Sequence, residues 1–202
     1  MADKATTYVP MTGVDMLHYA VVNTDTSTEY SAGTPVAVPG ATEVGFNVNA
    51  QTGTFYADNV PYATDTALGE IDVAVACADV PPSMRAAIYG YSYDATTGEL
   101  KEGELKSVAV ALMYRIRKSN GAYRYVTIYN AKAAPNEERV QTKGGSINFQ
   151  TNGFSMKAAT RAKDKMIRSI LDDDDPKLPT GVTPETIAAK YFTAVGATLT
   201  AS

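Results

Sequence analysis

SVAVALMYRIRKSNGAYRYVTIYN, residues 107–130, contains two runs of alternating side chains separated by Asn120-Gly121. Alternation with a period of two is typical of β-strands, whose successive side chains point to opposite faces of a sheet. Asn-Gly favours a two-residue hairpin turn because both residues tolerate positive φ. The stretch therefore predicts two antiparallel strands joined by a tight turn, and with them a mainly β fold.

The second of these strands has two faces that both suit burial. Tyr123, Tyr125 and Tyr129 lie on one face, and Val126 and Ile128 lie on the other. Such a strand is usually covered on both sides, either by a second sheet or by another subunit. Tyrosines are common at subunit interfaces, where the ring buries area and the hydroxyl finds a partner. We therefore predict that the three tyrosines contact a neighbouring subunit.

Further strand patterns precede and follow this hairpin. The clearest covers residues 70–80, where large apolar and small or acidic side chains alternate. A turn is expected at Gln51-Thr52-Gly53, between two short strands, and another at Lys143-Gly144-Gly145. The strand after the second turn is expected to contain a bulge at Asn152-Gly153. The expected strands are residues 14–22, two runs within 43–59, 70–80, 107–117, 123–130 and 146–158. Residues 161–176 fit a helix or a strand, and we favour a strand. Residues 23–42 and 60–69 are expected to be long polar loops.

Two helices are expected. Asp79 offers an N-cap for residues 81–89, and Gly90 stands where a C-terminal cap belongs. Near the C-terminus, Thr183 and Pro184 begin an amphipathic pattern that runs to Gly196. Runs of strands with few helices predict an α+β, mainly β domain, an antiparallel sandwich or open barrel with a flanking short helix and a C-terminal helix. We expect residues 1–202 to form a single domain.

The composition limits the possible functions. The chain has 22 acidic and 18 basic residues, a formal charge of −4 and a pI near 5.0. Tight nucleic-acid binding needs a concentrated positive surface, so it is disfavoured. Hydrophobic residues make up 45% of the chain, typical of a globular protein, yet no run approaches the roughly 20 apolar residues of a membrane helix. We expect a soluble protein without a membrane segment.

Residue types that carry chemistry are scarce. His18 is the only histidine and Cys77 the only cysteine, so neither has an evident partner for catalysis, a disulfide or a cysteine-based zinc site. Both are interpreted as packing residues. Lys143–Ser146 could bind an anion but is more typical of a hairpin turn, and Asp172–Asp175 lacks the spacing of a calcium loop and is interpreted as a solvated acidic turn. We expect no enzyme activity, no cofactor and no metal.

YRYVTIYNAKAAPNEERVQTKGGSINFQT, residues 123–151, resembles the major tail proteins of long-tailed bacteriophages, the tail tube subunits. In that family an aromatic strand leads into a Lys-Ala-Pro-Asn/Glu-Glu segment, then Thr-Lys-Gly and a strand that ends in Phe-Gln-Thr. Further matches follow in order: YADN at 56–59, EIDVAVACADVPPSMRAAIYG at 70–90 and AAKYFTAV at 188–195. The resemblance covers most of the chain and is weakest over residues 161–182.

The resemblance implies a β-sandwich subunit that closes into hexameric rings, stacked as a hollow tube around a tape measure protein. Tail terminator and distal tail proteins are implied partners, DNA is implied to pass without specific binding, and assembly is implied to occur in the host cytoplasm to form part of the virion tail. Some relatives append an immunoglobulin-like module, and none is expected here.

Several residues receive roles from this interpretation. Tyr56 and Asn59 join Tyr123, Tyr125 and Tyr129 as candidate inter-subunit contacts, and residues 23–42 and 60–69 are candidate ring-stacking loops. Because a negative lumen does not hold DNA phosphates, the candidate lumen acids are Asp72, Glu99, Glu102 and Glu104. The alternative is a β-sandwich binding module of a tail or baseplate, for carbohydrate or a receptor, which thirteen tyrosines could serve.

Overall fold

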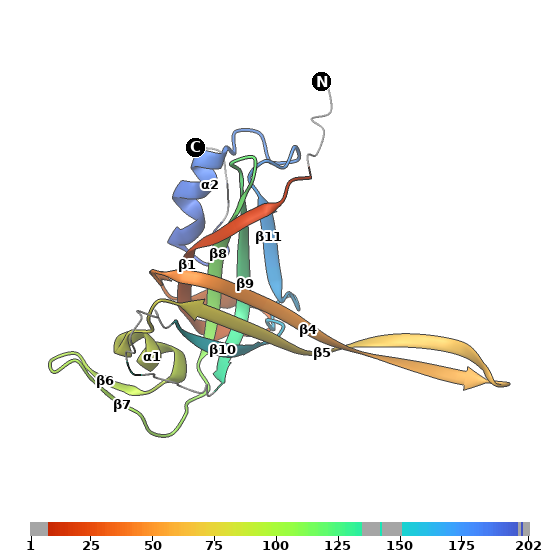
Figure 1. Cartoon of the computed structure of the whole chain (residues 1–202), viewed down its shortest axis with the longest axis horizontal. Helices are drawn as coiled ribbons and strands as arrows, with labels where there is room; N and C mark the ends of the chain where they lie inside the picture. Colours follow the sequence, from red (N-terminus) through yellow and green to blue (C-terminus); the bar gives the residue numbers. More distant parts are fainter. Residues whose placement is uncertain (1–7, 135–141, 143–150, 198, 200–202) are drawn as a thin grey trace.

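The hairpin around Asn120-Gly121 lies at the centre of the fold in the computed structural model, which describes residues 8–134, 142, 151–197 and 199 (Figure 1). β8 (Ala109–Lys118) and β9 (Tyr123–Ala134) pair in antiparallel fashion, as predicted. The turn is one residue longer than expected. The amide of Lys118 donates to the carbonyl of Ala122, and Gly121 has a φ of 86°. This hydrogen bond and this backbone angle are typical of a three-residue turn whose last residue is left-handed.

A single nine-stranded sheet contains most of the described strands, in the order β2-β1-β8-β9-β10-β5-β4, with β3 paired to β1 and β11 paired to β9. Every pairing is antiparallel. The additional strands are β1 (Met11–Asp25), β2 (Tyr30–Ala32), β3 (Val36–Ala37), β4 (Ala41–Ala57), β5 (Val60–Cys77), β10 (Asn152–Ala158) and β11 (Arg168–Asp172). β6 (Ser92–Asp94) and β7 (Glu99–Lys101) form a separate small sheet.

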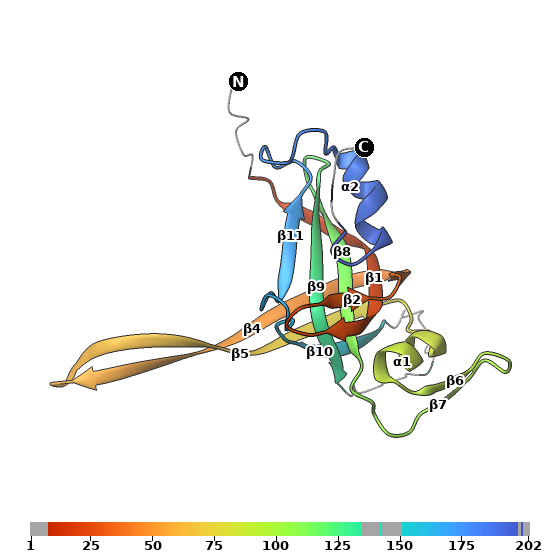
Figure 2. The same ribbon diagram turned by 180° about the vertical axis from the view of Figure 1, so that it is seen from behind.

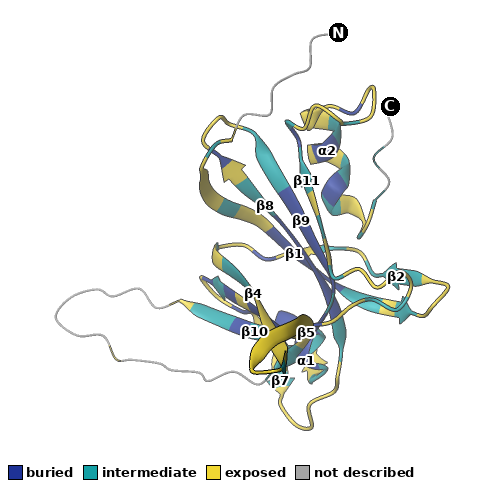
Figure 3. Cartoon of the chain, turned by 90° about the vertical axis from the view of Figure 1, so that its right-hand side faces the viewer, coloured by how far each residue is buried: buried dark blue, intermediate teal, exposed yellow. Residues whose placement is uncertain are grey.

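The main core lies where this sheet curls so that β4 and β5 cross β8 and β9 (Figures 1 and 2). Side chains from five strands meet there, among them Leu17, Val73, Leu112, Ile128 and Phe154, each with 1% exposure or less. Figure 3 shows the buried positions concentrated along β8 and β9. The mainly β, antiparallel fold with two short helices is therefore confirmed.

Both expected helices are present. α1 (Pro82–Tyr89) ends at Gly90, whose φ of 71° is the left-handed conformation of a C-terminal cap. Asp79 is not its N-cap, because the Asp79 carboxylate accepts from the amide of Val80 instead. α2 (Pro184–Lys190) begins after Thr183, whose hydroxyl accepts from the amide of Thr186, and continues into the short 3₁₀-helix η1 (Tyr191–Thr193).

The structure corrects the expected loops. Residues 60–69 belong to β5 and do not form a loop. The turn lies at Asp58-Asn59 and not at residues 51–53, which are part of β4 and pair with residues of β5. Residues 23–42 include the end of β1 and the strands β2 and β3. Thr, Ala and Gly make up half of residues 60–69, and Thr, Ser, Gly and Pro make up about half of residues 23–42. A solvent-exposed strand of this composition lacks the strong apolar alternation that marks a half-buried strand.

The later strands match the expectations in part. β10 pairs with β5 in continuous register from Asn152 to Ala158, so the bulge expected at Asn152-Gly153 is absent. A Cβ at Gly153 would lie 2.3 Å from the carbonyl oxygen of Val75, which explains the glycine by close backbone approach. Residues 168–172 form a strand, as we favoured for 161–176. The expected turn at 143–145 and the strand start at Ser146 lie outside the described residues.

Candidate assembly surface

A long two-stranded hairpin projects from the body of the subunit and has no other element packed along it (Figures 1 and 2). It consists of the distal parts of β4 and β5, and we define residues 47–70 as the arm. Every residue of the arm is exposed except Ala57, which is half-buried. An isolated two-stranded hairpin is marginally stable in water at best. The arm is therefore a segment that gains stability when another surface covers it.

The arm continues the core face of the sheet into solvent. Opposite residues of an antiparallel pair share a face, and alternate residues of one strand do too. Val48 lies opposite Ile71, and Ala50 lies opposite Leu68. Ile71 is 2% exposed whereas Leu68, on the same face, is 57% exposed. The face that packs the interior of the body is thus uncovered along the arm.

Two local features define the length and direction of the arm. At its tip Asp58 and Asn59 have φ values of 50° and 63°, and Ala57 pairs with Val60, as in a two-residue turn of type I′. At its base the register shifts between Val48 and Ala50. A Cβ at Gly69 would lie 2.1 Å from the carbonyl oxygen of Asn49, so only glycine fits this close approach of the two strands.

The base of the arm carries a small ionic network. The Lys157 ammonium lies 2.7 Å from a Glu70 carboxylate oxygen and 2.6 Å from one of Asp72. The side-chain amide of Asn49 donates to Asp72 at 2.8 Å. Hydrogen bonds from Lys157 and Asn49 lower the pKa of Asp72, and those to Asp72 and Glu70 raise the pKa of Lys157 to about 12. Asp72 is therefore ionised and locally neutralised by Lys157.

The exposed apolar side chains gather toward the tip of the arm. Phe55, Tyr56, Val60 and Tyr62 are 63%, 62%, 56% and 75% exposed. Among the described residues, few large hydrophobic side chains are as exposed as these. A patch of this kind on a folded subunit indicates an interaction surface. Tyr56, a predicted interface residue, thus lies in an exposed apolar patch, next to the exposed turn residue Asn59.

The predicted tyrosine face of β9 is largely inside the subunit. Tyr125 is fully buried and Tyr129 is 6% exposed, so neither offers a surface to a neighbouring subunit, and the prediction for these two residues is corrected. The C-terminal segment covers Tyr125, whose ring lies 4.8 Å from that of Tyr191, and Tyr123 is half-buried beside the same segment. The Tyr191 hydroxyl lies 2.7 Å from that of Thr127. The Arg161 guanidinium lies 3.8 Å from the centre of the Tyr129 ring. The second face of β9 is thus covered by later segments of the same chain.

The candidate lumen acids lie in two places. Asp72 lies at the base of the arm, whereas Glu99, Glu102 and Glu104 are exposed in or after β7, beside α1. Glu99 lies 3.5 Å from the ammonium of Lys101, and Glu102 lies 3.2 Å from the guanidinium of Arg85. The structure does not bring the four acids together, and their orientation toward a lumen stays a prediction.

The acidic run 172–175 is not simply a solvated turn, because three of its carboxylates have partners in the β8–β9 hairpin. Asp172 accepts two hydrogen bonds from Arg124, at 2.6 and 2.7 Å, and lies 2.9 Å from the Lys118 ammonium. Asp174 also pairs with Lys118. Asp173, 5% exposed, accepts from the amide of Tyr123 at 2.9 Å. We call these three acids with Lys118 and Arg124 the acidic clamp.

The pKa values in the clamp follow from burial and pairing. The hydrogen bond from Arg124 lowers the pKa of Asp172, with Lys118 adding to the effect. Desolvation raises the pKa of Asp173 despite its backbone hydrogen bond. Desolvation also lowers the pKa of Lys118, but hydrogen bonds to Asp174 and Asp172 outweigh it and raise the pKa overall. The clamp therefore holds β11 against β9 through ionised pairs around one buried acid.

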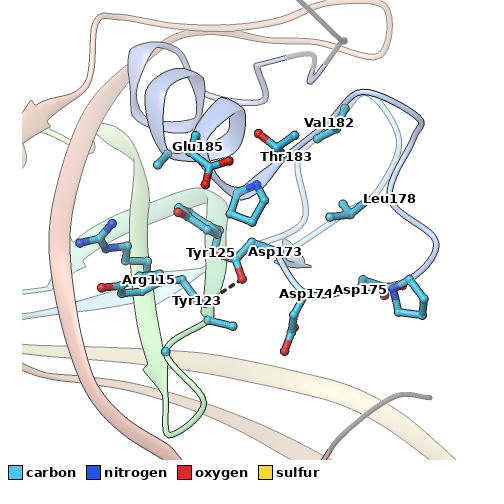
Figure 4. A pocket seen from close by; sticks show the side chains of 15 residues that line it. Arg115, Tyr123, Tyr125, Asp173, Asp174, Asp175, Leu178, Val182, Thr183 and Glu185 are labelled. Carbon is cyan, nitrogen blue, oxygen red and sulfur yellow. Dashed lines mark hydrogen bonds between the residues drawn. The ribbon is translucent and has the colours of Figure 1, made fainter. Parts of the chain in front are cut away.

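A hollow of about 590 Å³ lies between the clamp and the start of α2 (Figure 4). Its wall includes Tyr123, Tyr125, Leu178 and Val182. The Asp173 side chain also lines the hollow, where it accepts a hydrogen bond from the backbone amide of Tyr123. The described lining residues include neither histidine nor cysteine.

His18 and Cys77 both have structural contacts, in agreement with their interpretation as packing residues. The His18 ring stacks on Phe192 with centroids 4.6 Å apart, and its Nδ1 lies 2.8 Å from the carbonyl oxygen of Met16. Cys77 is fully buried, and burial raises the pKa of its thiol. Within the described ranges, no group of three or more histidine, cysteine, aspartate or glutamate side chains is arranged to hold a metal ion.

Sequence reasoning missed the arm as a projecting element and the clamp as a paired cluster. The Asp58-Asn59 pair was an available signal for the turn, because aspartate and asparagine tolerate positive φ. The clamp had no local signal, since its cations come from a hairpin about fifty residues earlier in the chain.

These features define a class of protein: a mainly β structural subunit whose exposed hairpin suits association. Residues 41–182 match the family model described as phage tail tube protein. Because the match covers well over half of the chain, the protein belongs to the phage tail tube family. This membership confirms the resemblance seen in the sequence, implies a location in the virion tail and implies assembly into a tube with other tail proteins. No curated protein matches the chain.

None of the helices within the described residues has the length and apolar character needed to cross a bilayer; α1 and α2 have 8 and 7 residues.

Proposed function

We propose that the protein assembles into hexameric rings that stack into the hollow tube of a phage tail, through which DNA passes during delivery. The observation that carries the proposal is the arm, whose core-type face is uncovered in the single subunit. Membership of the tail tube family supplies the partner, namely further copies of the same chain. Two different patches that meet head to tail build rings when the rotation closes and filaments when it does not.

The proposal includes the partners and the site of assembly. Tape measure, tail terminator and distal tail proteins are the further components, and assembly takes place in the host cytoplasm before the tail joins the virion. The net charge of −4 favours a lumen that does not retain DNA, because phosphate binding needs neutralising cations. Asp72, Glu99, Glu102 and Glu104 remain the proposed lumen acids, and Glu99, Glu102 and Asp72 are each partly neutralised by a nearby cation.

The arm also replaces the loop first expected at residues 60–69 as the proposed ring-stacking element. The second expected stacking loop, residues 23–42, has intramolecular contacts. The Tyr30 hydroxyl donates to the carbonyl of Tyr129 at 2.6 Å, and the Asp25 carboxylate accepts from Asn130 and from the amide of Ala162. Deleting residues 24–34 would therefore destabilise the subunit, which makes the arm the better target for mutation.

Carbohydrate binding by the exposed aromatic rings has less support from the geometry. The rings of Phe55 and Tyr62 are 6.3 Å apart and meet edge to face at 86°. Aromatic platforms for sugars expose flat ring faces, whereas this pair presents an edge against a face. The arm fits a protein partner better than a sugar.

The decisive experiment shortens the arm without opening the body. Gln51 and Ala67 lie opposite each other, so residues 52–66 can be replaced by Asn-Gly, which closes the strands with a tight turn. We expect the full-length protein to form tubes in negative stain as its concentration rises. The shortened protein should keep its far-ultraviolet circular dichroism and cooperative unfolding but stay small in sedimentation velocity.

A control keeps the arm at full length and leaves its charges and aromatic rings in place. Gly53→Ala adds a methyl group that meets nothing within 4 Å and should polymerise like the original. A full-length protein that remains monomeric at the highest attainable concentration would contradict the proposed function.

A further inference from the structure

We propose that the arm of one subunit docks on a basic and apolar surface beside β11 of a second copy of this chain. We call this surface the β11 face and define it by Lys163, Lys165, Met166, Arg168 and Ile170, all exposed. The inference rests on the proposed function and adds the receiving site. Charge, apolar exposure and an open strand edge of the β11 face support this site.

The charges of the arm are of one sign. Asp58 and Asp65 lie within it, Glu70 ends it, and no lysine or arginine occurs between Lys4 and Arg85. Complementary potentials select the surfaces that meet across an interface, and like charges that face each other are costly. The surface of a second copy that receives the arm must therefore be basic, and its lysines and arginines come from Arg85 and later residues.

The β11 face has this character. Within residues 161–170, Lys163, Lys165 and Arg168 supply positive charge around one acid, Asp164. Asp25 also approaches this segment, and its carboxylate accepts a hydrogen bond from the amide of Ala162. Asp164 is already bound by Arg161, whose Nε donates to it at 2.6 Å. Among the described residues, no ion pair involves either lysine. The two lysines are therefore available to carboxylates of another subunit.

Apolar side chains of the two surfaces also match. Met166 and Ile170 are 51% and 49% exposed, which is unusual for side chains of this size in a folded subunit. The arm presents Phe55 and Tyr62 at 63% and 75% exposure. Contact between the two patches removes both from water, with carboxylates and ammonium groups at the rim, as in protein interfaces generally.

β11 also has an open hydrogen-bonding edge. In the described part of the chain it pairs with β9 alone, from Arg168 opposite Ile128 to Asp172 opposite Arg124. Each arm strand likewise pairs only with the other arm strand over residues 50–68. Open edges of this kind are templates for strand addition from another chain. The acidic clamp fixes β11 in the position that such addition needs.

Two other surfaces of the subunit fit the arm less well. The hollow beside α2 is lined by Asp174, Asp175 and Glu185. The one cation among its described lining residues, Arg115, is already paired with Asp15. The surface around β7 carries Glu99, Glu102 and Glu104 against Lys101 and Lys106, so it has no excess of positive charge. Both would place carboxylates close to those of the arm, which leaves the β11 face as the complementary surface.

A charge swap tests the assignment. K163E/K165E places acids on the β11 face. D58N/D65K leaves a lysine as the one charged side chain of the arm beyond Glu70 at its base, and an asparagine at the first turn position still fits a positive φ. Each variant alone should raise the concentration needed for tube formation by about ten-fold. The combined variant D58N/D65K/K163E/K165E restores opposite charges and should recover tube formation, which a merely damaged fold could not do. K132E/K177E, a reversal of two exposed lysines elsewhere, should assemble normally.

A cross-link gives an independent readout. With Cys77→Ala to remove the native thiol, Y62C and I170C variants are mixed under mild oxidation, and a disulfide-linked dimer is expected. Mixing Y62C with L105C, which places a thiol at an exposed residue near β7, should give far less.

The outcomes separate this inference from the proposed function. Tubes that form equally well from K163E/K165E, or a cross-link to L105C as strong as that to I170C, overturn the β11 face as receiver while the tube itself stands. Failure of the unmodified protein to assemble overturns the proposed function instead.

Discussion

Removing one charge of the acidic clamp provides a quantitative test of how β11 is held. Asp172→Asn keeps the shape of the side chain but loses its charge-assisted hydrogen bonds with Arg124, at 2.6 and 2.7 Å, and its ion pair with Lys118. Lys118 is only 7% exposed in its side chain and keeps Asp174 as a partner. The variant therefore leaves both Arg124 and Lys118 with less neutralising negative charge, instead of leaving a single cation with none.

The magnitude follows from the exposure of the pair. Breaking a fully buried pair costs about 3–5 kcal/mol, whereas an exposed pair contributes about 0–1 kcal/mol. The Asp172 side chain is 22% exposed, between these limits, so we expect a loss of about 2 kcal/mol in the free energy of unfolding. For a chain of this length, that lowers the melting temperature by about 4–8 °C.

A matched control exists in the same sheet. Asp15 accepts two hydrogen bonds from Arg115, at 2.6 and 3.1 Å, but its side chain is 48% exposed. Asp15→Asn should therefore cost about 0.5 kcal/mol. Urea unfolding of dilute protein, followed by circular dichroism, measures both variants under the same conditions.

The pH dependence gives the prediction a second check. The pKa of Asp172 is lowered in the folded state, so its contribution is fully present above the unfolded value of about 3.8 and is lost as the pH falls through the folded value. The difference between Asp172→Asn and the unmodified protein should be constant near neutral pH and should shrink below about pH 4. A cost no larger than that of Asp15→Asn, or a difference that persists in acid, would refute the reasoning.

Three further predictions concern other parts of the subunit. Gly69→Ala should distort the base of the arm and block assembly, since its Cβ would lie 2.1 Å from a carbonyl oxygen, whereas Gly53→Ala, with nothing within 4 Å, should leave tube formation in sedimentation unchanged. Tyr191→Phe should cost about 1–3 kcal/mol by leaving the buried Thr127 hydroxyl unpaired, and adding Thr127→Val should recover part of that loss in a double-mutant cycle of urea unfolding. Cys77 should react with iodoacetamide only as fast as the subunit unfolds, because the thiol is fully buried and its pKa is raised; rapid labelling of the native protein would contradict this.

Sequence patterns predicted those elements whose large apolar side chains alternate. Residues 107–130 and the helix after Thr183 have a strong periodicity because burial selects large side chains at regular positions. The arm has no such selection. Residues 60–69 contain Thr, Ala, Gly, Pro and Asp at seven of ten positions, a composition that equally fits a loop. Their strand structure was therefore not predictable from periodicity.

The candidate site was harder to predict because it depends on contacts between distant segments. The tyrosine face of β9 was correctly identified as needing cover, but the pattern alone does not say whether a neighbour or the chain's own C-terminal helix supplies it. Tyr125 and Tyr191 are sixty-six positions apart, and they meet only through the fold. Asp172 and Arg124 are likewise separated by 48 positions.

The tight turn at Asp58-Asn59 limits how the hairpin can vary among related subunits. A strand rises by roughly 3.3 Å per residue, and a shift of one residue moves every side chain to the opposite face. Insertions or deletions that keep the apolar side chains on one face must therefore remove or add matched pairs on both strands. The reach of the arm can then change only in steps of roughly 7 Å. If the arm docks on a second copy as proposed, the spacing between neighbouring subunits would change in the same steps.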